Sequence, residues 1–473
     1  MKQAALFILT ICLFASSMFA QESIGIGISN YSPTNSLLLN PSSIVDSKAF
    51  IDIHLVGFSV FARNDFVHFD GNQVSLTNPN SFNGAEVLYN EKRAPFRAYS
   101  DVLVQGPTVT ATIGKHSFGL YTGVRSVTDV RGLGQKTADY IINGFQYGPY
   151  IGTDTRITNL RATTLAWAEA GLSYGQIIRQ TGNDLLTAGV HVKRLFGIGA
   201  AAARLNEWHF TVEDSTTMQT HSISGSYGFN EPGWNTGKGW GVDIGFTYKK
   251  TKSGVSNYIP HLRAGGCETC DYQYKVSVAL LDIGRVKFDP VFYASDFNED
   301  SEYTLENFDS ADPEGLDGVS TFLNDNFELQ EDNQKANFRV ALPAALSAQF
   351  DYNLGYNVYA NASLVMGVPF KRNFGIQRAA SLSLTPRYEI KRFEAALPIT
   401  LHEIADPIVG FMVRLNSIII GTDNLGPYLF NSDIYGADIY FHLKYTIFRA
   451  PGCKGKTRKR GQRGGKIVPC ASW

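Results

Sequence analysis

The sequence predicts an all-β protein, an antiparallel transmembrane β-barrel of about 14 strands. Three observations predict it: an N-terminal export signal, two-faced strands that recur along the chain, and no apolar run suited to a spanning helix. The composition agrees, with 45 Gly, 23 Tyr and 31 Phe among 473 residues and no long helical stripe. We therefore expect one large sheet rather than several small cores.

Residues 1–20 have the features of a secretory signal peptide, which predicts Sec-dependent export. Lys2 supplies the charge, Ala4 to Phe14 the apolar core, and a mostly small-residue stretch ends at Ala20. No later stretch offers ~18 uninterrupted apolar residues. Two classes remain, a secreted soluble protein and a barrel in the outer membrane of a Gram-negative cell.

The mature chain divides into a barrel over residues 21–448 and a basic tail over residues 449–473. Near its start, Asn40-Pro41-Ser42 predicts a short helical turn, because Asn caps a helix and Pro fits its first position. The first strand is predicted at about Ala49 to Phe61. A clear hairpin follows, in which Gly114-Lys115-His116 turns the chain.

The hairpin from Thr163 to Gly197 shows the two-faced pattern most clearly. Its apolar face carries Ala166, Ala168, Ala170, Leu172 and Tyr174, then Leu186, Ala188, Val190 and Val192. Its polar face carries Trp167, Glu169, Gly171, Ser173 and Gly175, then Thr187, Gly189, His191 and Lys193. A register in which paired residue numbers sum to 362 places Glu169 opposite Lys193 and leaves a five-residue loop.

Later strands show the same alternation of apolar and polar residues. Predicted strands are Gly239 to Tyr248, Tyr274 to Leu280, Leu346 to Tyr352, Val358 to Val365, Ser381 to Ile390, Val409 to Gly421 and Ala437 to Phe448. A phase break near Asp282-Ile283-Gly284 predicts a bulge. Counting back from Phe448 places the short Lys391-Arg392-Phe393 turn outside the cell, against the rule that short turns are periplasmic.

Charged side chains recur on the inner face of these strands. A charge at every second residue is hard to place in a dry sandwich core and easy to place in a hydrated lumen. The predicted lumen-facing residues are Glu169, His191, Lys193, Asp243, Arg387, Glu389, Arg414, Asp438, His442 and Lys444.

Four cysteines remain after export, as the pairs Cys267/Cys270 and Cys453/Cys470. In an oxidising compartment we expect disulfides. Cys267-Glu-Thr-Cys270 lacks a second ligand pair at zinc-finger spacing, so a loop-stapling disulfide is preferred over a metal site. No metal ligand and no cofactor is predicted.

The charge is unevenly distributed. The total of −1 includes eight basic residues in the tail and Lys2 in the signal, so the body from Gln21 to Phe448 carries −10. Residues 296–332 hold thirteen acidic residues and no Lys or Arg. Asp296, Asn298 and Asp300 have the spacing of a calcium loop, but the turn glycine and terminal carboxylate are missing. A solvated acidic loop is preferred over a calcium site.

The basic tail and the outer surface suggest the partners. We expect contact with outer-membrane lipids, and contact of residues 449–473 with an envelope protein or peptidoglycan carboxylates. The alternative is a solvated extension. Nucleic acid is not expected in this compartment. No catalytic residue is predicted, since neither His191 nor His442 is accompanied by a serine or acid motif.

Several stretches together resemble a known kind of protein. They are Asn40-Pro41-Ser42, Trp167 to Tyr174, Gly189 to Gly197, Gly239 to Tyr248, Leu342-Pro343-Ala344, Thr385 to Tyr388 and Gly421 to Asn424. In this order they resemble an uncharacterised family of Bacteroidetes-type outer-membrane barrels, and more distantly FadL-like transporters and the PorV and PorP/SprF barrels. The resemblance implies a single barrel with an N-terminal segment near or in its lumen, and no agreed substrate.

Two functions follow as expectations. The first is a channel or FadL-like carrier for a small molecule, with hydrophobic molecules included. The second is a non-transporting scaffold or accessory subunit of an envelope complex, such as the type IX secretion or gliding machinery. An enzyme is not expected.

Overall fold

A computed structural model describes residues 23–90, 95–145, 148–214, 217–262, 269–289, 293–299, 303–306, 337–368, 374–403 and 406–450. The predicted signal peptide, the tail beyond residue 450, Cys267, Cys453, Cys470 and most of the acidic stretch 296–332 lie outside these residues. Within the described ranges, no helix is long and apolar enough to cross a bilayer.

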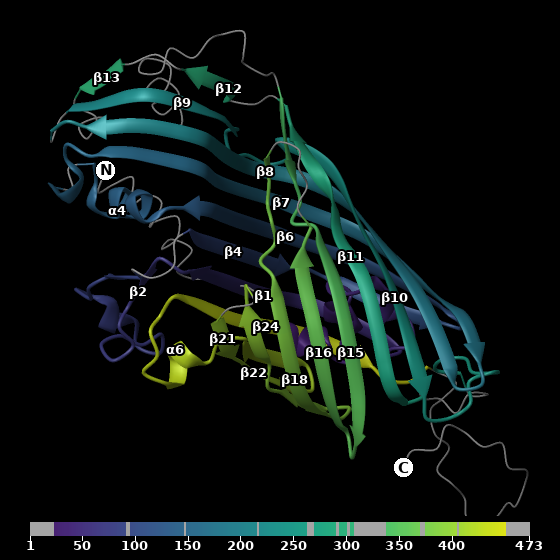
Figure 1. Cartoon of the computed structure of the whole chain (residues 1–473). Helices are drawn as coiled ribbons and strands as arrows, with labels where there is room; N and C mark the ends of the chain where they lie inside the picture. The colour runs from purple at the N-terminus through teal and green to yellow at the C-terminus, as the bar shows by residue number, and fades with distance from the viewer. Residues whose placement is uncertain are drawn as a thin grey trace, which may run out of the picture.

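The strands run along one closed wall (Figure 1). The first half contains β1 (Ile51–Asn64), β4 (Phe96–Gln105), β5 (Thr108–Ile113), β6 (His116–Leu133), β7 (Asp154–Thr181), β8 (Asp184–Val212), β9 (Thr217–Phe229), β10 (Gly237–Thr251), β11 (Tyr272–Phe288), β12 (Tyr293–Glu299) and β13 (Tyr303–Glu306). The second half contains β14 (Phe338–Ala341), β15 (Ala345–Gly355), β16 (Val358–Gly367), β17 (Phe374–Gly375), β18 (Ser381–Glu389), β19 (Phe393–Ala396), β20 (Ile399–His402), β21 (Asp406–Val409), β22 (Phe411–Leu415), β23 (Ile418–Thr422) and β24 (Gly436–Ile447).

Short helices and one small hairpin lie apart from the wall. They are α2 (Ile24–Gly27), α3 (Pro33–Ser36), η1 (Pro41–Ile44), η2 (Pro79–Phe82), α4 (Gln135–Asn143), η3 (Gly148–Tyr150), α6 (Gly426–Leu429), and the strand pair β2 (Val67–His68) and β3 (Leu88–Tyr89). The expected turn at Asn40 is confirmed: the Asn40 side chain caps η1 by accepting from the backbone N–H of Ser42.

Apart from β17, which pairs in parallel with β14 over two residues, the segments of the described wall join into 14 transmembrane strands, so the predicted fold is confirmed. Eight are continuous: β1, β6, β7, β8, β16, β18, β23 and β24. Six are interrupted: β4 with β5, β9 with β10, β11 with β12 and β13, β14 with β15, β19 with β20, and β21 with β22. Strand β1 pairs antiparallel with β24 over Ile51–Val56, which closes the barrel.

Proline explains several interruptions. Pro107 lies between β4 and β5, Pro343 between β14 and β15, and Pro398 between β19 and β20. Proline has no N–H to donate to the neighbouring strand, so the ladder stops for a few residues and resumes.

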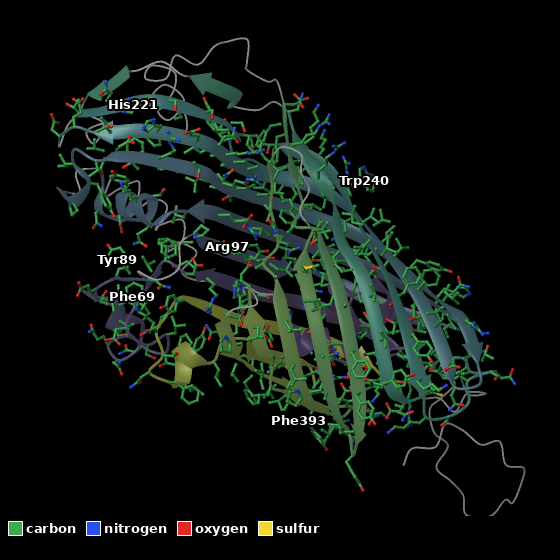
Figure 2. The ribbon with its side chains drawn as sticks, viewed as in Figure 1. Phe69, Tyr89, Arg97, His221, Trp240 and Phe393 are labelled. Atoms are coloured by element: carbon green, nitrogen blue, oxygen red, sulfur yellow. The ribbon has the colours of Figure 1, made fainter. Side chains whose placement is uncertain are left out.

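The wall has an apolar outside and a polar inside, as the alternation predicts. In β18 the burial alternates at every residue: Leu382, Leu384 and Tyr388 are exposed, and their neighbours are buried. Trp240 projects from the outer wall (Figure 2), with 59% of its surface exposed. Water does not tolerate so wide an apolar surface, whereas hydrocarbon does.

Ile244 lies midway between Trp240 and Tyr248 on the outer face of β10, and is 41% exposed. We expect Ile244→Arg to destabilise the folded barrel by about 2–4 kcal/mol, because the guanidinium must enter hydrocarbon. Urea unfolding in lipid vesicles measures this difference. Tyr356→Arg in an exposed turn is the control, expected within about 0.5 kcal/mol of the parent; equal effects at both positions would contradict a lipid-facing wall.

The prediction of one strand from Val409 to Gly421 is wrong. The chain turns back at Asn416-Ser417, and β22 pairs with β23 across this turn. Asn416 adopts φ 52°, a left-handed conformation that Asn tolerates better than most residues. With this strand added, the Lys391-Arg392 turn lies at the same end as Ile51 and Ile447, which removes the conflict with the short-turn rule.

The predicted register of the Thr163 to Gly197 hairpin is also wrong. Glu169 pairs with Leu195 and Lys193 with Gly171, so paired numbers sum to 364. Gly182 at φ 57° allows a two-residue turn where five residues were expected, and a bulge between Ile177 and Arg179 absorbs the difference. Both charged side chains are nevertheless buried on the same face.

Candidate functional site

The N-terminal segment, residues 23–49, lies inside the barrel. All of its residues are buried except Leu38, Ser43 and Lys48, which are partly buried. It contacts strands on all sides of the wall: the Ile24 N–H donates to Asp423 at 3.0 Å, and Ser29 Oγ donates to Glu394 at 2.7 Å. Ser42 Oγ lies 2.7 Å from Thr247 Oγ1 of β10, and Thr34 Oγ1 donates to Asp52 of β1 at 2.7 Å, so the segment fills the lumen from one side of the wall to the other.

Three glycines make room for the helical turn η1. Gly175, Gly189 and Gly245 are paired side by side on β7, β8 and β10, and form the glycine row. A Cβ on Gly189 would lie 2.5 Å from the carbonyl of Pro41, and one on Gly245 would lie 2.1 Å from Asn40 Oδ1. These distances are far below van der Waals contact, so only glycine lets η1 approach the wall this closely.

The C-terminal part of the segment is held by β10 and by the loop between β10 and β11. Tyr258 donates from its hydroxyl to Asp46, and Lys249 Nζ lies 2.9 Å from the same carboxylate. Burial raises the pKa of Tyr258 well above its usual value, and the Asp46 charge adds to this effect. Burial lowers the pKa of His261, whose Nε2 lies 2.9 Å from the carbonyl oxygen of Ser47. Tyr258 therefore stays a donor and His261 stays neutral near pH 7.

The centre of the lumen holds an ionic cluster around Asp282, which we call the Asp282 cluster. Asp282 lies in a bulge of β11 opposite Asp243, where the register shifts between Val242 and Ile244, so the predicted bulge is confirmed. Its carboxylate accepts from Arg125 at 2.8 Å, from Arg378 at 3.4 Å and from Lys193.

The neighbours of Lys193 extend this cluster. Its Nζ lies 3.0 Å from Asp243, which also pairs with His191 Nδ1 at 3.2 Å. Glu169 accepts from the Tyr121 hydroxyl and from Trp167 Nε1, each at 3.1 Å. Each of these charged side chains is at most 11% exposed, and each has an opposite charge or a hydrogen-bond donor within reach. Such networks are stable only when complete.

A second ionic cluster links the wall to the N-terminal segment. Arg387 makes a two-pronged contact with Asp351, at 3.0 and 2.8 Å, and its Nε lies 3.3 Å from Glu389. Glu389 in turn accepts from Asn30 of the N-terminal segment and lies 3.6 Å from Lys48.

The last strands contact the segment in the same way. Lys444 donates to the carbonyl of Tyr31 at 2.8 Å and lies 3.2 Å from Asp52. Arg414 pairs with Glu394 at 2.9 Å. His442 lies 3.1 Å from His54, and Asp438 accepts from the backbone N–H of Asp423.

A small cavity separates the N-terminal segment from the Asp282 cluster. Its volume is about 50 Å³, and its lining includes Ile26, Leu39, Arg125, Lys193, Asp243 and Asp282. A water molecule needs about 10–15 Å³ by this measure. The cavity therefore holds a few waters and no organic ligand while the segment is in place.

The family model described as a family of unknown function (DUF5723) matches residues 41–423, which is most of the chain. The chain belongs to this family. The family match covers the wall from η1 to the end of β23, and so includes the glycine row and the Asp282 cluster.

Comparison with solved structures finds the DUF5723 chain similar to hydrocarbon transporters at low identity. The toluene transporter TbuX of Ralstonia pickettii has 8% identity and a TM-score of 0.40, with 92% of this chain and 100% of that chain covered. A FadL homologue of Pseudomonas aeruginosa has 8% identity and a TM-score of 0.31, with 90% and 98% covered. TM-scores this low carry no argument about function. No curated protein matches the chain.

The structure brings the ten predicted lumen residues of the DUF5723 chain into separate groups. Glu169, His191, Lys193 and Asp243 meet in the Asp282 cluster, and Arg387 meets Glu389. Arg414, Asp438, His442 and Lys444 have other partners, and each of the ten is at most 5% exposed.

Sequence reasoning missed the partners of these residues. Asp282, Arg125, Asp101, Arg378 and Asp351 complete the ion pairs. The signal was available for Asp282, since a carboxylate within a predicted bulge is a residue whose side chain is redirected. Cys270 is disulfide-bonded; the pairing with Cys267, and that of Cys453 with Cys470, stay predictions.

Proposed function

We propose that this chain is an outer-membrane channel or carrier for a small molecule, and that its N-terminal segment must move before anything passes. One observation carries the proposal: a barrel with an apolar outer wall holds, in its lumen, a segment fixed by hydrogen bonds and ion pairs. Polar contacts of this kind exchange with water or with an entering ligand.

The outer membrane is the location that this wall supports. Closed antiparallel barrels with short turns at one end are the outer-membrane type, and their termini lie on the periplasmic side. The turns at Gly114-Lys115, Gly182-Asn183 and Asn416-Ser417 lie at the end where β1 begins and β24 ends. The segment would thus enter its lumen from the periplasmic side after export.

The substrate class follows from the cavity lining. Its lining combines the apolar side chains of Leu38, Leu39 and Leu103 with the charged side chains of the Asp282 cluster. A small amphiphilic or hydrophobic molecule with one polar end fits this mixture better than a bare ion does.

A disulfide that locks the segment tests the proposal. Ser42 Oγ lies 2.7 Å from Thr247 Oγ1, so cysteines at these two positions are close enough to bond. We expect the oxidised Ser42→Cys/Thr247→Cys variant to conduct no solute in liposome swelling and reductant to restore the parent rate.

The control is a pair of cysteines within the wall. Ser383 Oγ and Thr400 Oγ1 lie 2.7 Å apart on the neighbouring wall strands β18 and β20. The oxidised Ser383→Cys/Thr400→Cys variant links two strands of the wall to each other and should keep the parent rate. Permeability that survives the lock in the first variant would contradict a moving segment.

The closed lumen favours a second candidate, a non-transporting scaffold of an envelope complex. A cavity of about 50 Å³ and a complete ion-pair network suit a wall that never opens. We propose that such a scaffold contacts outer-membrane lipids through its wall, and an envelope protein or peptidoglycan through the basic residues 449–473. If the parent, the reduced variant and a variant without the segment all fail to conduct, the scaffold is favoured.

A further inference from the structure

Strands β7, β8 and β9 extend into a lobe beyond the rest of the barrel (Figure 1). β7 has 28 residues and β8 has 29, whereas a barrel strand needs about 9–11 residues to cross a bilayer. One face of the lobe packs an aromatic cluster of Tyr140, Phe210 and their neighbours against α4. The opposite face is open to solvent.

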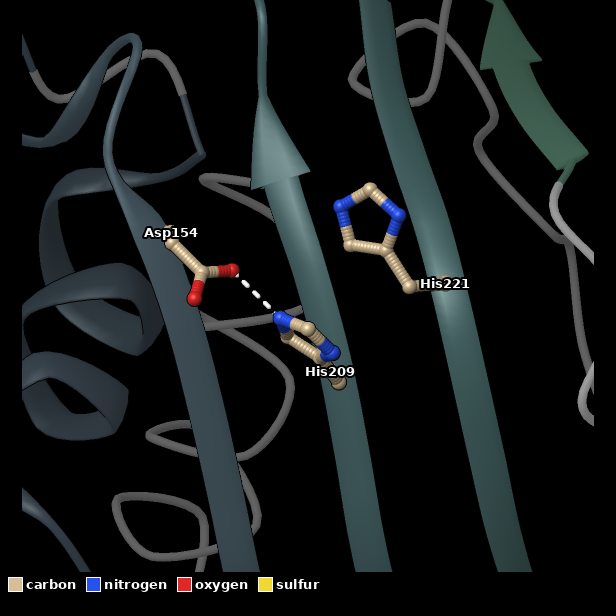
Figure 3. Close-up of side chains that lie close together, drawn as sticks. All are labelled: Asp154, His209 and His221. Atoms are coloured by element: carbon tan, nitrogen blue, oxygen red, sulfur yellow. Dashed lines mark hydrogen bonds and ion pairs between the residues drawn. The ribbon is translucent and has the colours of Figure 1, made fainter.

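Three metal-ligating side chains converge on that open face. Asp154 from β7, His209 from β8 and His221 from β9 project into the same space from three neighbouring strands (Figure 3). One ligand atom from each lies within 4.8 Å of the other two. His209 Nε2 already lies 2.5 Å from Asp154 Oδ1, and the two imidazole rings are 4.7 Å apart.

A bulge puts His221 in this position. In the pairing of β8 with β9, His209 is opposite Ser222 and Phe210 is opposite Thr220, so His221 is the extra residue. Bulges redirect a side chain and occur next to functional sites more often than elsewhere. Without the bulge, His221 would lack this approach to His209.

A neighbouring hydroxyl holds the second ring. Thr211 Oγ1 lies 2.9 Å from His221 Nε2, and Thr211 is directly opposite Asp154 across the strand pair. Ligating histidines usually have such an outer partner, which fixes the orientation of the ring. The four residues therefore form a partly organised group rather than three independent surface side chains.

The donor set selects a class of ion. Two imidazoles and one carboxylate suit Zn²⁺ and its transition-metal neighbours, whereas Ca²⁺ and Mg²⁺ prefer oxygen ligands alone. Around a tetrahedral Zn²⁺ with bonds near 2.0 Å, ligand atoms lie roughly 3.3 Å apart. The separation of 2.5 Å between His209 Nε2 and Asp154 Oδ1 lies below this value, and the upper limit of 4.8 Å for the group lies above it. Side-chain rotations that move the ligand atoms by about an ångström therefore suffice. Asp154 is 69% exposed, which gives an ion access from the external solution.

We propose that Asp154, His209 and His221 bind a divalent transition-metal ion at the end of the lobe, with water completing its coordination. Thr211 is a positioning residue for His221. The ion links β7, β8 and β9 beyond the membrane, where no lipid supports the sheet.

Zn²⁺ binding to the full-length protein in detergent tests the proposal, measured by isothermal titration after chelator treatment. We expect the parent protein to bind one equivalent of Zn²⁺. In His209→Gln and in His221→Gln this binding should be lost or weakened at least about tenfold in Kd. Mg²⁺ and Ca²⁺ should not compete. Co²⁺ should give visible absorption bands of a tetrahedral site in the parent alone.

His68→Gln is the matched control, because His68 lies 3.8 Å from Asp433 without a second imidazole in the described surroundings. It should keep the parent affinity. Heat-dependent migration on gels shows that each variant remains a folded barrel. Binding in the His209→Gln/His221→Gln double variant as tight as in the parent, or an equal loss in His68→Gln, would overturn the site.

Discussion

Asp282→Asn is expected to lower the free energy of unfolding of the barrel by about 3–5 kcal/mol. The substitution removes one buried negative charge and leaves Arg125, Lys193 and Arg378 with fewer counter-charges than they have in the parent. A buried cation without its partner loses hydration and gains nothing in return.

The substitution isolates the charge, because Asp282 adopts φ 53° and Asn tolerates this conformation as well as Asp does. The backbone N–H of residue 282 keeps its bond of 2.6 Å to Asp243. Urea unfolding in detergent micelles, followed by tryptophan fluorescence, measures the difference.

Glu207→Gln is the matched acid-to-amide control. Glu207 lies 3.2 Å from Arg156, but the two side chains are 42% and 59% exposed. A solvated pair of this kind contributes less than about 1 kcal/mol. If Asp282→Asn also stays within about 1 kcal/mol of the parent, the Asp282 cluster does not stabilise the lumen.

Gly189→Leu is expected to open the lumen without unfolding the wall. A Cβ at this position would overlap the backbone of Pro41 and Ser42, at 2.5 and 2.6 Å, so η1 has to leave the glycine row. The wall itself accepts the change, since Leu suits a strand better than Gly does. Planar-bilayer recordings should show larger and longer conductance steps in the variant than in the parent, in which the segment leaves the path only transiently.

Gly148→Leu serves as the control, because a Cβ at Gly148 meets no atom within 4 Å. It should show the conductance of the parent. A folded Gly189→Leu barrel with the conductance of the parent would mean that the N-terminal segment does not block the path, and would contradict the proposed function.

Much of the wall could be predicted because each strand faces hydrocarbon on one side and the polar lumen on the other, which gives the sequence a two-residue period. Ser381 to Ile390 and Ala437 to Phe448 were assigned correctly to strands, with the charged side chains of Arg387 and Lys444 buried. The turn at Asn40 was also correct, since a cap and a proline are local signals.

The errors lie where a local signal was weak or was overridden. The Val409 to Gly421 stretch contains no Gly or Pro at its turn, only Asn416-Ser417, so the sequence pattern does not separate the two short strands. The predicted sum of paired residue numbers in the hairpin was wrong by two, because a two-residue alternation does not reveal the bulge at Ile178.

The partners within the lumen could not be predicted. Arg125 and Asp282 are separated by 157 residues, and Asp154 and His221 belong to different strands of the lobe. Such contacts depend on strand order, shear and bulges, and no short motif records them.

The sequence by itself determined the barrel class and which face of each strand carries charge, because hydrocarbon and water select side chains residue by residue. The resemblance implied an N-terminal segment near or in the lumen, but only the tertiary structure decided which residues fill it, which charges pair, and that two histidines and an aspartate meet on the lobe. The physical reason is distance along the chain: partition between solvents acts on each residue alone, whereas ion pairing and close packing require the whole wall to close first.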